Sequence, residues 1–454
     1  MTHRAPPDKP LRQILPPLLG ALMAGCAAPR PVSFLVISMD TFRADRLGPR
    51  GADGATLTPA LDELAAESLV FTRAYAQANE TLFSHAALFT GRYPSEIAPL
   101  DYRRFRLTPD AVTMAACLGL EGYRTEAVVA GGHLAPQFGL GAGFQRYLPM
   151  DDFSSFQQTE PVAVARLEEL AADGGPFLLF VHGYDTHSPY VKPGILFRLG
   201  SPDYAGIMLD AARDPLTYER ILFDRYFPDF TPTQITDAEG DQFLSPASFD
   251  ELEALAAARP EAGIPLERAD LDFLLHTYDA AARHADFFVG LLLDSLDEQG
   301  LADDTVVVVL GDHGEDLLEH GHFNHRLSLH DPNVHVPLLL RIPGELPERI
   351  DSAVALVDVA PTLLTLAGAR ERETRGRSLL DPLPGRAVYS ESMRGDISVR
   401  DEQARLILRA SAPDGWRAEG APAGAWLGDD DGQILAWSDS HRATLGRALE
   451  ALLP

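Results

Sequence analysis

The sequence predicts an α/β fold: a doubly wound, mostly parallel sheet followed by a smaller C-terminal α+β subdomain. Apolar runs at residues 34–39, 177–181 and 306–310 are bounded by polar residues, as are strands buried on both faces of a parallel sheet. Segments with the helical spacing of apolar residues alternate with these runs along the chain. That alternation favours right-handed crossovers, which place helices on both faces of the sheet.

The elements between these strands follow from local signals. Residues 58–67 predict a helix, because Thr58 is a capping residue and Pro59 stands at the first helical position. Residues 125–130 predict a strand that ends in glycines. The other helices expected in this part of the chain are one that starts near Ser84 and runs to Thr90, and two over residues 161–172 and 271–296.

The expected catalytic domain covers residues 32–344 and contains an insertion at 194–267. The insertion is rich in Pro, Asp and aromatic residues and has weak periodicity, which is typical of a segment that shapes or covers a binding cleft. Residues 345–454 form the expected smaller subdomain. Its predicted elements are shorter: a helix over 359–367 and strands near 388–390 and 405–408.

Residues 1–26 have the features of an export signal. Basic residues precede a short apolar core, and Met23-Ala-Gly-Cys26 follows it. The core is shorter than the roughly 20 apolar residues that span a bilayer. The ending resembles the lipobox of bacterial lipoproteins, which implies a lipid on Cys26 that would anchor the protein in the bacterial cell envelope, on the periplasmic or extracellular side. An ordinary cleaved signal with an incidental cysteine is the alternative.

The chain is acidic, with 66 Asp and Glu against 38 Lys and Arg and a formal net charge of −28. No basic stripe is present that could displace counterions from nucleic acid, so a nucleic-acid partner is excluded. The same charge repels anionic substrates at long range. A site that processes anions in this protein would therefore need local positive charge from a metal ion, Arg and His.

Acidic residues follow two of the predicted strands. Asp40 comes after the run 34–39, and Asp312 with His313 comes after 306–310. Open α/β sheets build their ligand sites at the carboxyl ends of strands. One such Asp is better explained as a turn or helix cap, but two in the same position indicate a site for a divalent ion. Oxygen ligands alone favour Ca²⁺ or Mg²⁺, and an imidazole makes Mn²⁺ or Zn²⁺ plausible.

Thr81 lies at or just before the start of the helix that runs to Thr90, for which Ser84 or a nearby polar residue is the expected cap. The amides and dipole of a helix N-terminus stabilise an anion, and a metal-bound hydroxyl loses its proton more easily. Thr81 is therefore a candidate nucleophile, with helix capping as the alternative. His187 and His325 are candidates for anion contact and leaving-group protonation, and surface histidines are the alternative for them.

The motifs around these residues resemble those of the sulfatase family, which belongs to the alkaline phosphatase superfamily, and they occur in the same order. The resemblance implies one divalent metal ion, Ca²⁺ being usual in the family, with Asp40, Asp312 and His313 as ligands and Thr81 as a nucleophile that also touches the metal. The segments that carry the resemblance are residues 38–48, 58–65, 84–94, 185–190 and 311–321, with further blocks at 357–364 and 376–380.

The resemblance also implies roles for three histidines. His187 matches the imidazole that contacts the transferred group, and His325 stands where relatives carry a Lys or His facing the substrate oxygens. His85 replaces an Arg that many members use beside the nucleophile. Typical members convert a Cys or Ser at the position of Thr81 into formylglycine; Thr cannot give that aldehyde, so no formylglycine is expected.

The sequence thus predicts an exported, metal-dependent hydrolase of sulfate or phosphate esters, acting on an anionic ester. Two alternatives remain open. Threonine nucleophiles occur in the superfamily among phosphodiesterases and phosphoryl-group transferases, so a phosphodiesterase, a phosphonate ester hydrolase or such a transferase is one alternative. A catalytically silent envelope-binding protein that retains the fold is the other.

Overall fold

The structure is a computed structural model. It describes residues 31–50, 55–188, 190, 206, 235–236, 242–243, 268–317, 319, 324–326, 328–370, 373–381, 386–401, 405–408 and 425–428. The predicted signal segment 1–26 with Cys26 lies outside these residues. So does the predicted insertion 194–267, except for residue 206 and the paired strands β9 (Ile235–Thr236) and β10 (Gln242–Phe243).

An eight-stranded sheet forms the centre of the protein, in the order β14-β4-β13-β11-β1-β8-β6-β7. Among these strands only β13 runs against the common direction, which confirms the predicted doubly wound, mostly parallel sheet. The strands are β1 (Ser33–Met39), β4 (Leu69–Phe71), β6 (Arg124–Val129), β7 (Arg146–Pro149), β8 (Phe177–Gly183), β11 (Thr305–Gly311), β13 (Leu338–Arg341) and β14 (Glu348–Ile350).

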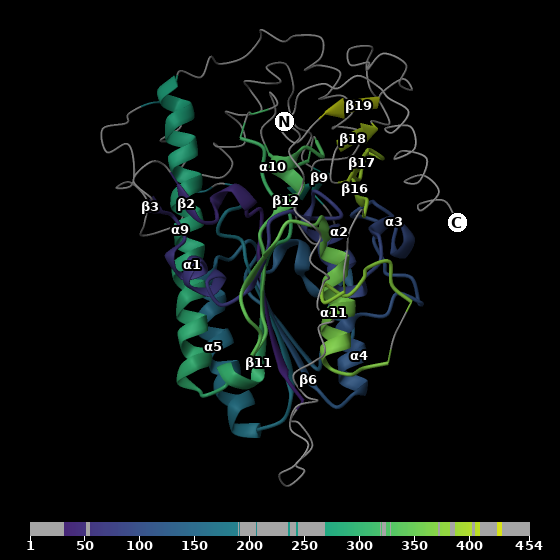
Figure 1. Cartoon of the computed structure of the whole chain (residues 1–454). Coiled ribbons are helices and arrows are strands. Elements are labelled where there is room, and N and C mark those ends of the chain that lie inside the picture. The colour runs from purple at the N-terminus through teal and green to yellow at the C-terminus, as the bar shows by residue number, and fades with distance from the viewer. Residues whose placement is uncertain are drawn as a thin grey trace, which may run out of the picture.

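Helices cover both faces of the sheet (Figure 1). Alternate side chains of β1 pack into two different cores: Phe34 and Val36 into one, Leu35 and Ile37 into the other. All four are fully buried, because successive strand residues point to opposite faces of a sheet that is covered on both sides. The helices are α1 (Pro59–Ala65), α5 (Phe156–Asp173) and α9 (Arg268–Glu298) on one face, and α2 (Thr81–Thr90), α4 (Met114–Leu120) and α11 (Val359–Leu366) on the other.

Helix α5 begins five residues before the predicted start at Pro161. Proline favours the first helical position, but here Ser155 and Gln158 form a capping box that starts the helix at Phe156. The side chain of Asp185, which follows β8, accepts the Phe156 N–H at 2.7 Å. The cap therefore links the start of α5 to the loop that carries His187.

The remaining elements are short. Strand β5 (Ala74–Tyr75) lies between β12 (His335–Val336) and β15 (Val354–Ala355), and β2 (Pro49–Arg50) pairs with β3 (Ala55–Thr56). Short helices are α3 (Pro94–Ile97) and α10 (Asp331–Val334), with single 3-10 turns at Ala44–Arg46, Gly132–Leu134, Pro136–Phe138, Ala302–Asp304 and Leu356–Asp358.

The C-terminal part contains a four-stranded antiparallel sheet of β16 (Val388–Glu391), β17 (Ile397–Arg400), β18 (Arg405–Leu408) and β19 (Ala425–Gly428). The expected boundary after residue 344 falls between β13 and β14, which belong to the same main sheet. Helix α11 also packs into the main core. We therefore propose that the smaller subdomain starts after α11.

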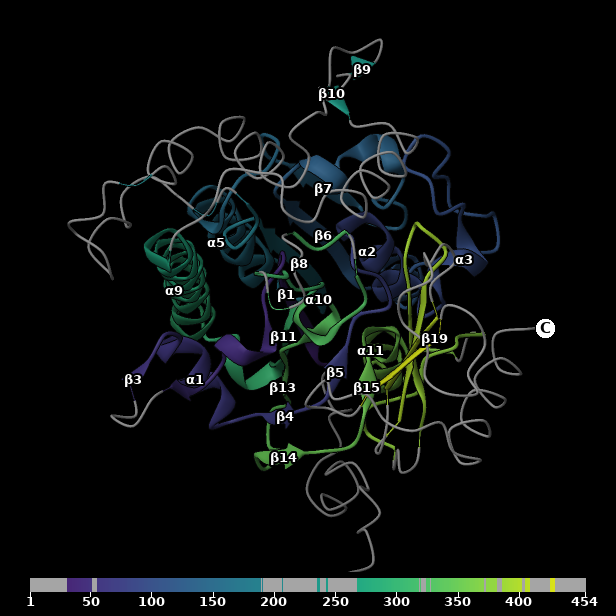
Figure 2. The same cartoon turned by 90° about the horizontal axis from the view of Figure 1, so that it is seen from above.

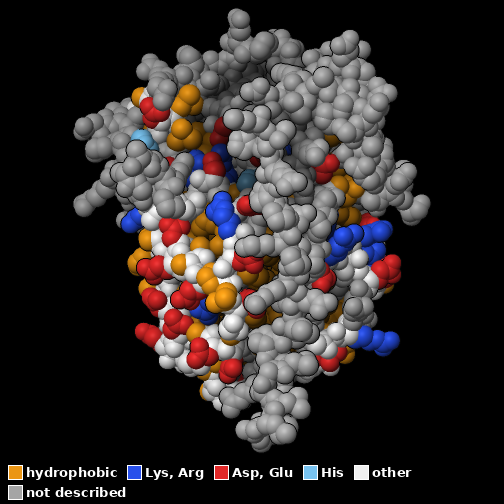
Figure 3. Space-filling model, in the orientation of Figure 1, with side chains coloured by type: hydrophobic (Ala, Val, Ile, Leu, Met, Phe, Trp, Pro, Cys, Tyr) orange, Lys and Arg blue, Asp and Glu red, His pale blue; other side chains and the backbone are white. Residues whose placement is uncertain are grey.

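On the face shown in Figure 3, acidic side chains are spread over the part of the surface that the structure describes, in keeping with the net charge. Within the described residues, none of the helices has the length and hydrophobicity needed to cross a bilayer.

Candidate functional site

Three neighbouring parallel strands bring the predicted acidic residues together. Met39 at the end of β1 is in register with Gly311 of β11 and with Gly183 of β8, so the loops after these strands leave the sheet at one edge. Asp40 and Asp312 stand on these loops and are fully buried. The prediction that they meet at the carboxyl edge of the sheet is confirmed.

A tight turn after β1 orients the carboxylate of Asp312. Its Oδ1 accepts the backbone N–H groups of Thr41 at 3.0 Å and of His313 at 2.8 Å, and Oδ2 has no hydrogen-bond donor among the residues that the structure describes. Thr41 has a φ of 53°, a left-handed conformation that is uncommon for this residue type. The Tyr278 hydroxyl of α9 donates to the Thr41 carbonyl at 2.6 Å and so holds this turn.

The hydroxyl of Thr81, the first residue of α2, points at Asp40. Its Oγ1 donates to Asp40 Oδ2 at 3.0 Å and lies 3.4 Å from His313 Nε2. The residue before the helix, Glu80, makes no side-chain cap. Of the expected caps, Ser84 or a nearby polar residue, Ser84 is excluded: it lies within α2, and its hydroxyl donates to the Asp312 carbonyl at 2.6 Å.

Asp40, Asp312 and His313 can present one ligand atom each within 4.8 Å of one another. His313 Nδ1 donates to the Gly314 carbonyl, which leaves the lone pair of Nε2 for the cluster, 3.5 Å from Asp312 Oδ2. Ligands bound at about 2.1 Å in a tetrahedral shell lie about 3.4 Å apart. The donor atoms of this group, with Thr81 Oγ1, therefore fit a divalent ion.

The protonation states agree with this fit. Burial lowers the pKa of His313 to about 3, so its ring is neutral and able to coordinate. Burial, followed by the neighbouring charge of Asp40, raises the pKa of Asp312 well above its usual value. Two buried carboxyl groups this close are stable as anions only with a positive partner.

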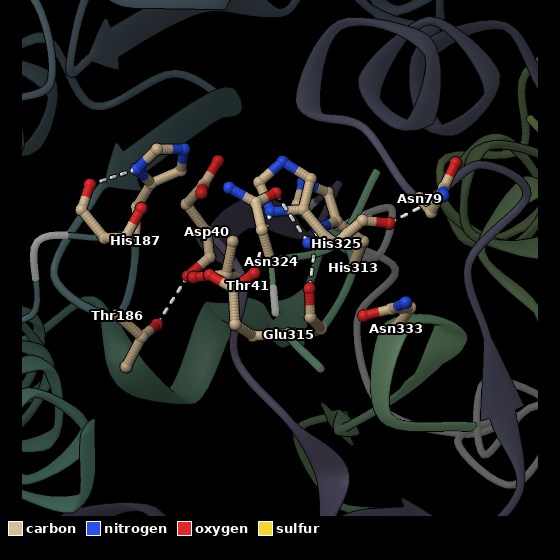
Figure 4. A network of polar contacts seen from close by, with 12 residues as sticks. Asp40, Thr41, Asn79, Thr186, His187, His313, Glu315, Asn324, His325 and Asn333 are labelled. Atoms are coloured by element: carbon tan, nitrogen blue, oxygen red, sulfur yellow. Dashed lines mark hydrogen bonds and ion pairs between the residues drawn. The ribbon is translucent and has the colours of Figure 1, made fainter. Parts of the chain in front are cut away.

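His187 and His325 lie beside this cluster (Figure 4). The ring of His325 is 4.4 Å from that of His313 and 5.5 Å from that of His187, measured between centroids. His187 Nδ1 donates to the Ser188 carbonyl at 2.7 Å, and His325 Nδ1 lies 3.1 Å from Glu315 Oε1. In both residues Nδ1 is thus the nitrogen that contacts the protein, and the predicted roles in anion contact and leaving-group protonation stay predictions.

His85 lies behind the nucleophile candidate rather than in front of it. Its Nδ1 donates to the Thr81 carbonyl at 2.8 Å, and its Nε2 accepts from the Ser38 hydroxyl at 2.9 Å. The side chain is fully buried. With both nitrogens engaged, His85 is placed to support the first turn of α2 rather than to protonate a leaving group.

Sequence reasoning missed His133 and Arg326. His133 packs on Tyr102 with ring centroids 4.6 Å apart, and burial, then the charge of Arg326, lowers its pKa well below the usual value. The same Arg326 charge acts on His313 and His325. Arg326 thus supplies the local positive charge that an anion site in this acidic chain requires. In the sequence, Arg326 could have been noticed because it directly follows His325. His133 could have been noticed because it comes shortly after the strand that ends at Val129.

His182 was also missed. It lies on β8 in register with Ser38, and its Nε2 is 3.5 Å from Asp40 Oδ2. The only signal in the sequence was one ionisable residue at the end of an otherwise apolar strand.

Comparison with known proteins agrees with this architecture. The sequence model of the family described as Sulfatase matches residues 33–369. Among curated proteins, the steryl-sulfatase of Rattus norvegicus is 27% identical over 455 aligned residues, which cover 82% of this chain and 74% of that protein.

Solved structures extend the likeness to the whole fold. The phosphonate monoester hydrolase of Agrobacterium radiobacter superposes with a TM-score of 0.65 at 18% identity, covering 93% of this chain and 95% of the other. The lipoteichoic acid synthase LtaP of Listeria monocytogenes superposes with a TM-score of 0.62 at 16% identity, covering 93% and 91%. At these identities the structural likeness speaks for the fold alone.

Proposed function

The chain belongs to the sulfatase family and is a hydrolase of sulfuric or phosphoric esters, and from this premise we propose that it attacks its ester with Thr81 at a divalent-metal centre. The observation that carries the proposal is the placement of the Thr81 hydroxyl, 3.0 Å from Asp40 Oδ2 and 3.4 Å from His313 Nε2. A hydroxyl in hydrogen-bond reach of a carboxylate and at a helix N-terminus is placed for nucleophilic attack.

Asp40, Thr81, Asp312 and His313 are the residues that would hold the ion. Its chemistry there is to lower the pKa of a bound hydroxyl and to neutralise charge that develops on the ester. The oxygen ligands are compatible with the Ca²⁺ usual in the family, and the imidazole of His313 supports Mn²⁺ or Zn²⁺.

The side chains divide the work of the reaction. Thr81 Oγ1 forms a bond to sulfur or phosphorus while the bond to the leaving-group oxygen breaks. Asp40 Oδ2, which already accepts the hydroxyl hydrogen bond, is the acceptor at hand for the Thr81 proton. His187 and Arg326 stabilise the non-bridging oxygens. Burial and nearby positive charge lower the pKa of His325, so its ring is neutral in the free protein; it takes up a proton as the anionic ester binds and passes that proton to the leaving group. Water then cleaves the ester on Thr81 and restores the hydroxyl.

A phosphate-type ester is favoured over a sulfate ester by one feature of the site. The resemblance implies that typical sulfatases attack sulfate esters with a formylglycine, and Thr81 cannot be converted into that residue. A hydroxyl nucleophile is instead suited to phosphoryl transfer. A phosphodiester, a phosphonate monoester or transfer to a second alcohol is therefore the second candidate reaction. The likeness to a phosphonate monoester hydrolase is compatible with it.

The test is a substrate panel of an aryl sulfate, a phosphate monoester, a phosphodiester and a phosphonate monoester, each assayed with Mn²⁺, Zn²⁺ and Ca²⁺. Wild type should cleave at least one of them. Thr81→Ala should abolish cleavage while reducing the metal content only in part, and Thr81→Ser should keep measurable turnover because it keeps the hydroxyl. Unchanged turnover in Thr81→Ala would remove Thr81 as the nucleophile. No cleavage in any combination would favour the silent binding protein.

We also propose that the enzyme is exported and held at the bacterial cell envelope by a lipid on Cys26, as the sequence of residues 1–26 suggests. Metabolic labelling with a fatty acid analogue should mark the wild-type protein and not Cys26→Ala. Equal labelling of the two proteins would contradict the anchor.

A further inference from the structure

A second group of potential metal ligands lies directly behind the first. His85, His182 and Asp312 can each present a ligand atom within 4.8 Å of the others, and all three side chains are fully buried. They come from α2, β8 and the loop after β11. Asp312 is common to this group and to the group of Asp40 and His313.

Within this group, His182 is the residue whose ring nitrogens are buried and unsatisfied. Neither of its ring nitrogens has a hydrogen-bond partner among the described residues, and leaving buried polar atoms unsatisfied destabilises the folded protein. Its ring is held instead by edge contacts, with centroids 5.1 Å from His85 and 4.7 Å from Tyr184 at interplanar angles of 85° and 88°. A neutral imidazole fixed in this way is pre-oriented for a cation.

We propose that His85, His182 and Asp312 bind a second divalent cation of the Zn²⁺ type, next to the catalytic one, so that the protein carries a binuclear centre that shares Asp312. Two imidazoles and one carboxylate form a ligand set that Zn²⁺ takes in catalytic sites, where a fourth position stays open. His85 Nδ1 lies 3.6 Å from Asp312 Oδ2, close to the about 3.4 Å between tetrahedral ligands.

When His85 binds a cation, its ring proton moves from one nitrogen to the other and is not lost. Nδ1 now donates to the Thr81 carbonyl, and Nε2 accepts from Ser38. Binding a cation through Nδ1 requires the other tautomer, in which that proton sits on Nε2 and is donated to the Ser38 hydroxyl. No net proton is released, and the hydrogen bond to Thr81 is exchanged for a metal bond.

The inference rests on the proposed function in one respect, because both cations use Asp312. A simpler explanation of His182 is a hydrogen bond to Asp40, whose Oδ2 lies 3.5 Å away. The two explanations differ in the number of bound ions, which can be counted without any measurement of turnover.

The experiment counts ions in the full-length protein. Metal is removed with a chelator, Zn²⁺ is added back, excess is dialysed away, and bound zinc is measured by mass spectrometry against protein concentration. Wild type should hold two ions per chain and His182→Phe one. The control is His276→Gln, which removes an exposed histidine of α9 and should still hold two; a count of one there would assign the second ion to the surface and overturn the proposal.

A Co²⁺ titration of wild type supplies a second measurement that needs no variant to fold. Two equivalents with distinct visible absorption bands support the binuclear centre. Saturation at one equivalent overturns it and leaves the proposed function intact, whereas no uptake at all contradicts both. Two ions in a folded His182→Phe protein would also overturn the second site, because a Phe ring offers no ligand.

Discussion

At the scale of single residues, the carboxyl group of Asp312 is fully buried beside a second carboxyl group, that of Asp40. Its Oδ1 is held by two backbone amides, and its Oδ2 faces both clusters of potential ligands. Burial and the charge of Asp40 raise its pKa. The charged form of this carboxyl group therefore destabilises the metal-free protein, and the same charge favours the binding of a cation. Both effects can be measured.

Asp312→Asn should stabilise the metal-free protein and weaken metal binding. A carboxyl whose pKa is raised on folding lends stability below the pKa of the unfolded chain, and this stability is lost as pH rises through the folded-state value. Asn does not ionise, so metal-free Asp312→Asn should escape that loss, and its Tm at pH 8 should exceed that of metal-free wild type. Calorimetric titration should show at least a tenfold weaker metal affinity.

Asp303→Asn, which changes an exposed residue just before the opposite end of β11 from Asp312, is the matched control and should change neither quantity. A lower Tm of metal-free Asp312→Asn would contradict the account of the buried charge.

Several of the site residues that the sequence predicted stand beside a recognisable element. Asp40 and Asp312 follow strands, and Thr81 begins a helix. His182 could not be predicted, because a lone His in an apolar strand is usually a satisfied core residue, and its neighbours Asp40 and His85 come from other elements. The orientation of His85 toward Ser38 is set by the side-chain rotamer, which no motif encodes.

At the scale of elements, a buried ion pair fastens α5 to β6. Arg166 Nε donates to Glu126 Oε2 at 2.6 Å, and its second nitrogen reaches Oε1 at 3.2 Å. Both side chains are almost fully buried. Breaking such a pair leaves an uncompensated charge in the core, whereas replacing both partners by apolar groups costs much less.

Arg166→Met should therefore lower the free energy of unfolding by about 3 kcal/mol, since removal of one partner of a buried pair costs about 3–5 kcal/mol and Arg124 remains within 3.2 Å of Glu126. The double variant Arg166→Met with Glu126→Leu should recover more than half of that loss. Urea unfolding of the single and double variants is the measurement. A double variant that is less stable than Arg166→Met would refute this description of the pair.

The start of α1 depends on a carboxylate from another helix. Asp286 of α9 accepts the N–H groups of Leu61 at 2.8 Å and of Ala60 at 3.2 Å. Burial nevertheless raises the pKa of Asp286 to about 6. Because the folded-state pKa lies above the ordinary value, this group lends stability below about pH 4 that is lost as pH rises through about 6.

Asp286→Asn should remove this pH dependence. From pH 4 to pH 7 the wild type should lose stability through Asp286, and the Asn variant should lose less, because its amide oxygen can still accept one or both backbone donors without ionising. Chemical unfolding at both pH values gives the difference, with Asp294→Asn, on the same helix, as the control. Parallel pH profiles for wild type and Asp286→Asn would contradict the raised pKa.

Strands made of continuous apolar runs were predictable, and short or exposed strands were not. The strands at 34–39 and 306–310 are runs of buried residues that only a covered parallel sheet explains. Strand β7 has half-exposed and exposed side chains throughout, and β14 is exposed on most of its length, so neither presents a hydrophobic pattern. Their pairing is decided by the neighbouring strand, which the local sequence does not reveal.

At the scale of the whole molecule, the net charge of −28 opposes the approach of an anionic ester. Salt screens this long-range repulsion, with a Debye length of about 30 Å at 0.01 M and about 8 Å at 0.15 M. The value of kcat/KM for a charged substrate should therefore rise between 10 and 150 mM NaCl, while kcat stays nearly constant. Steady-state kinetics over this range decide the point. A falling kcat/KM would mean that Arg326 and the metal dominate the field that the substrate meets.

The fold class was predictable because it rests on the order of strands and helices, which the sequence displays. The residue at which the catalytic domain ends was harder to predict. The chain returns to the main sheet with β14 and to the main core with α11, and the run Pro343-Gly344 before them has the composition of a linker although it is a turn between two strands of the sheet.

The ligand candidates come from widely separated parts of the chain, since Asp40 follows the first strand and His313 follows β11. A nascent polypeptide still on the ribosome, or one ended by a premature stop codon before β11, carries Asp40 and Thr81 without Asp312 and His313. Under the mechanism proposed above, such a product should be inert toward esters however well its early helices form. Reactivity is thus gained late in translation, and unfinished copies leave the cell's own esters untouched.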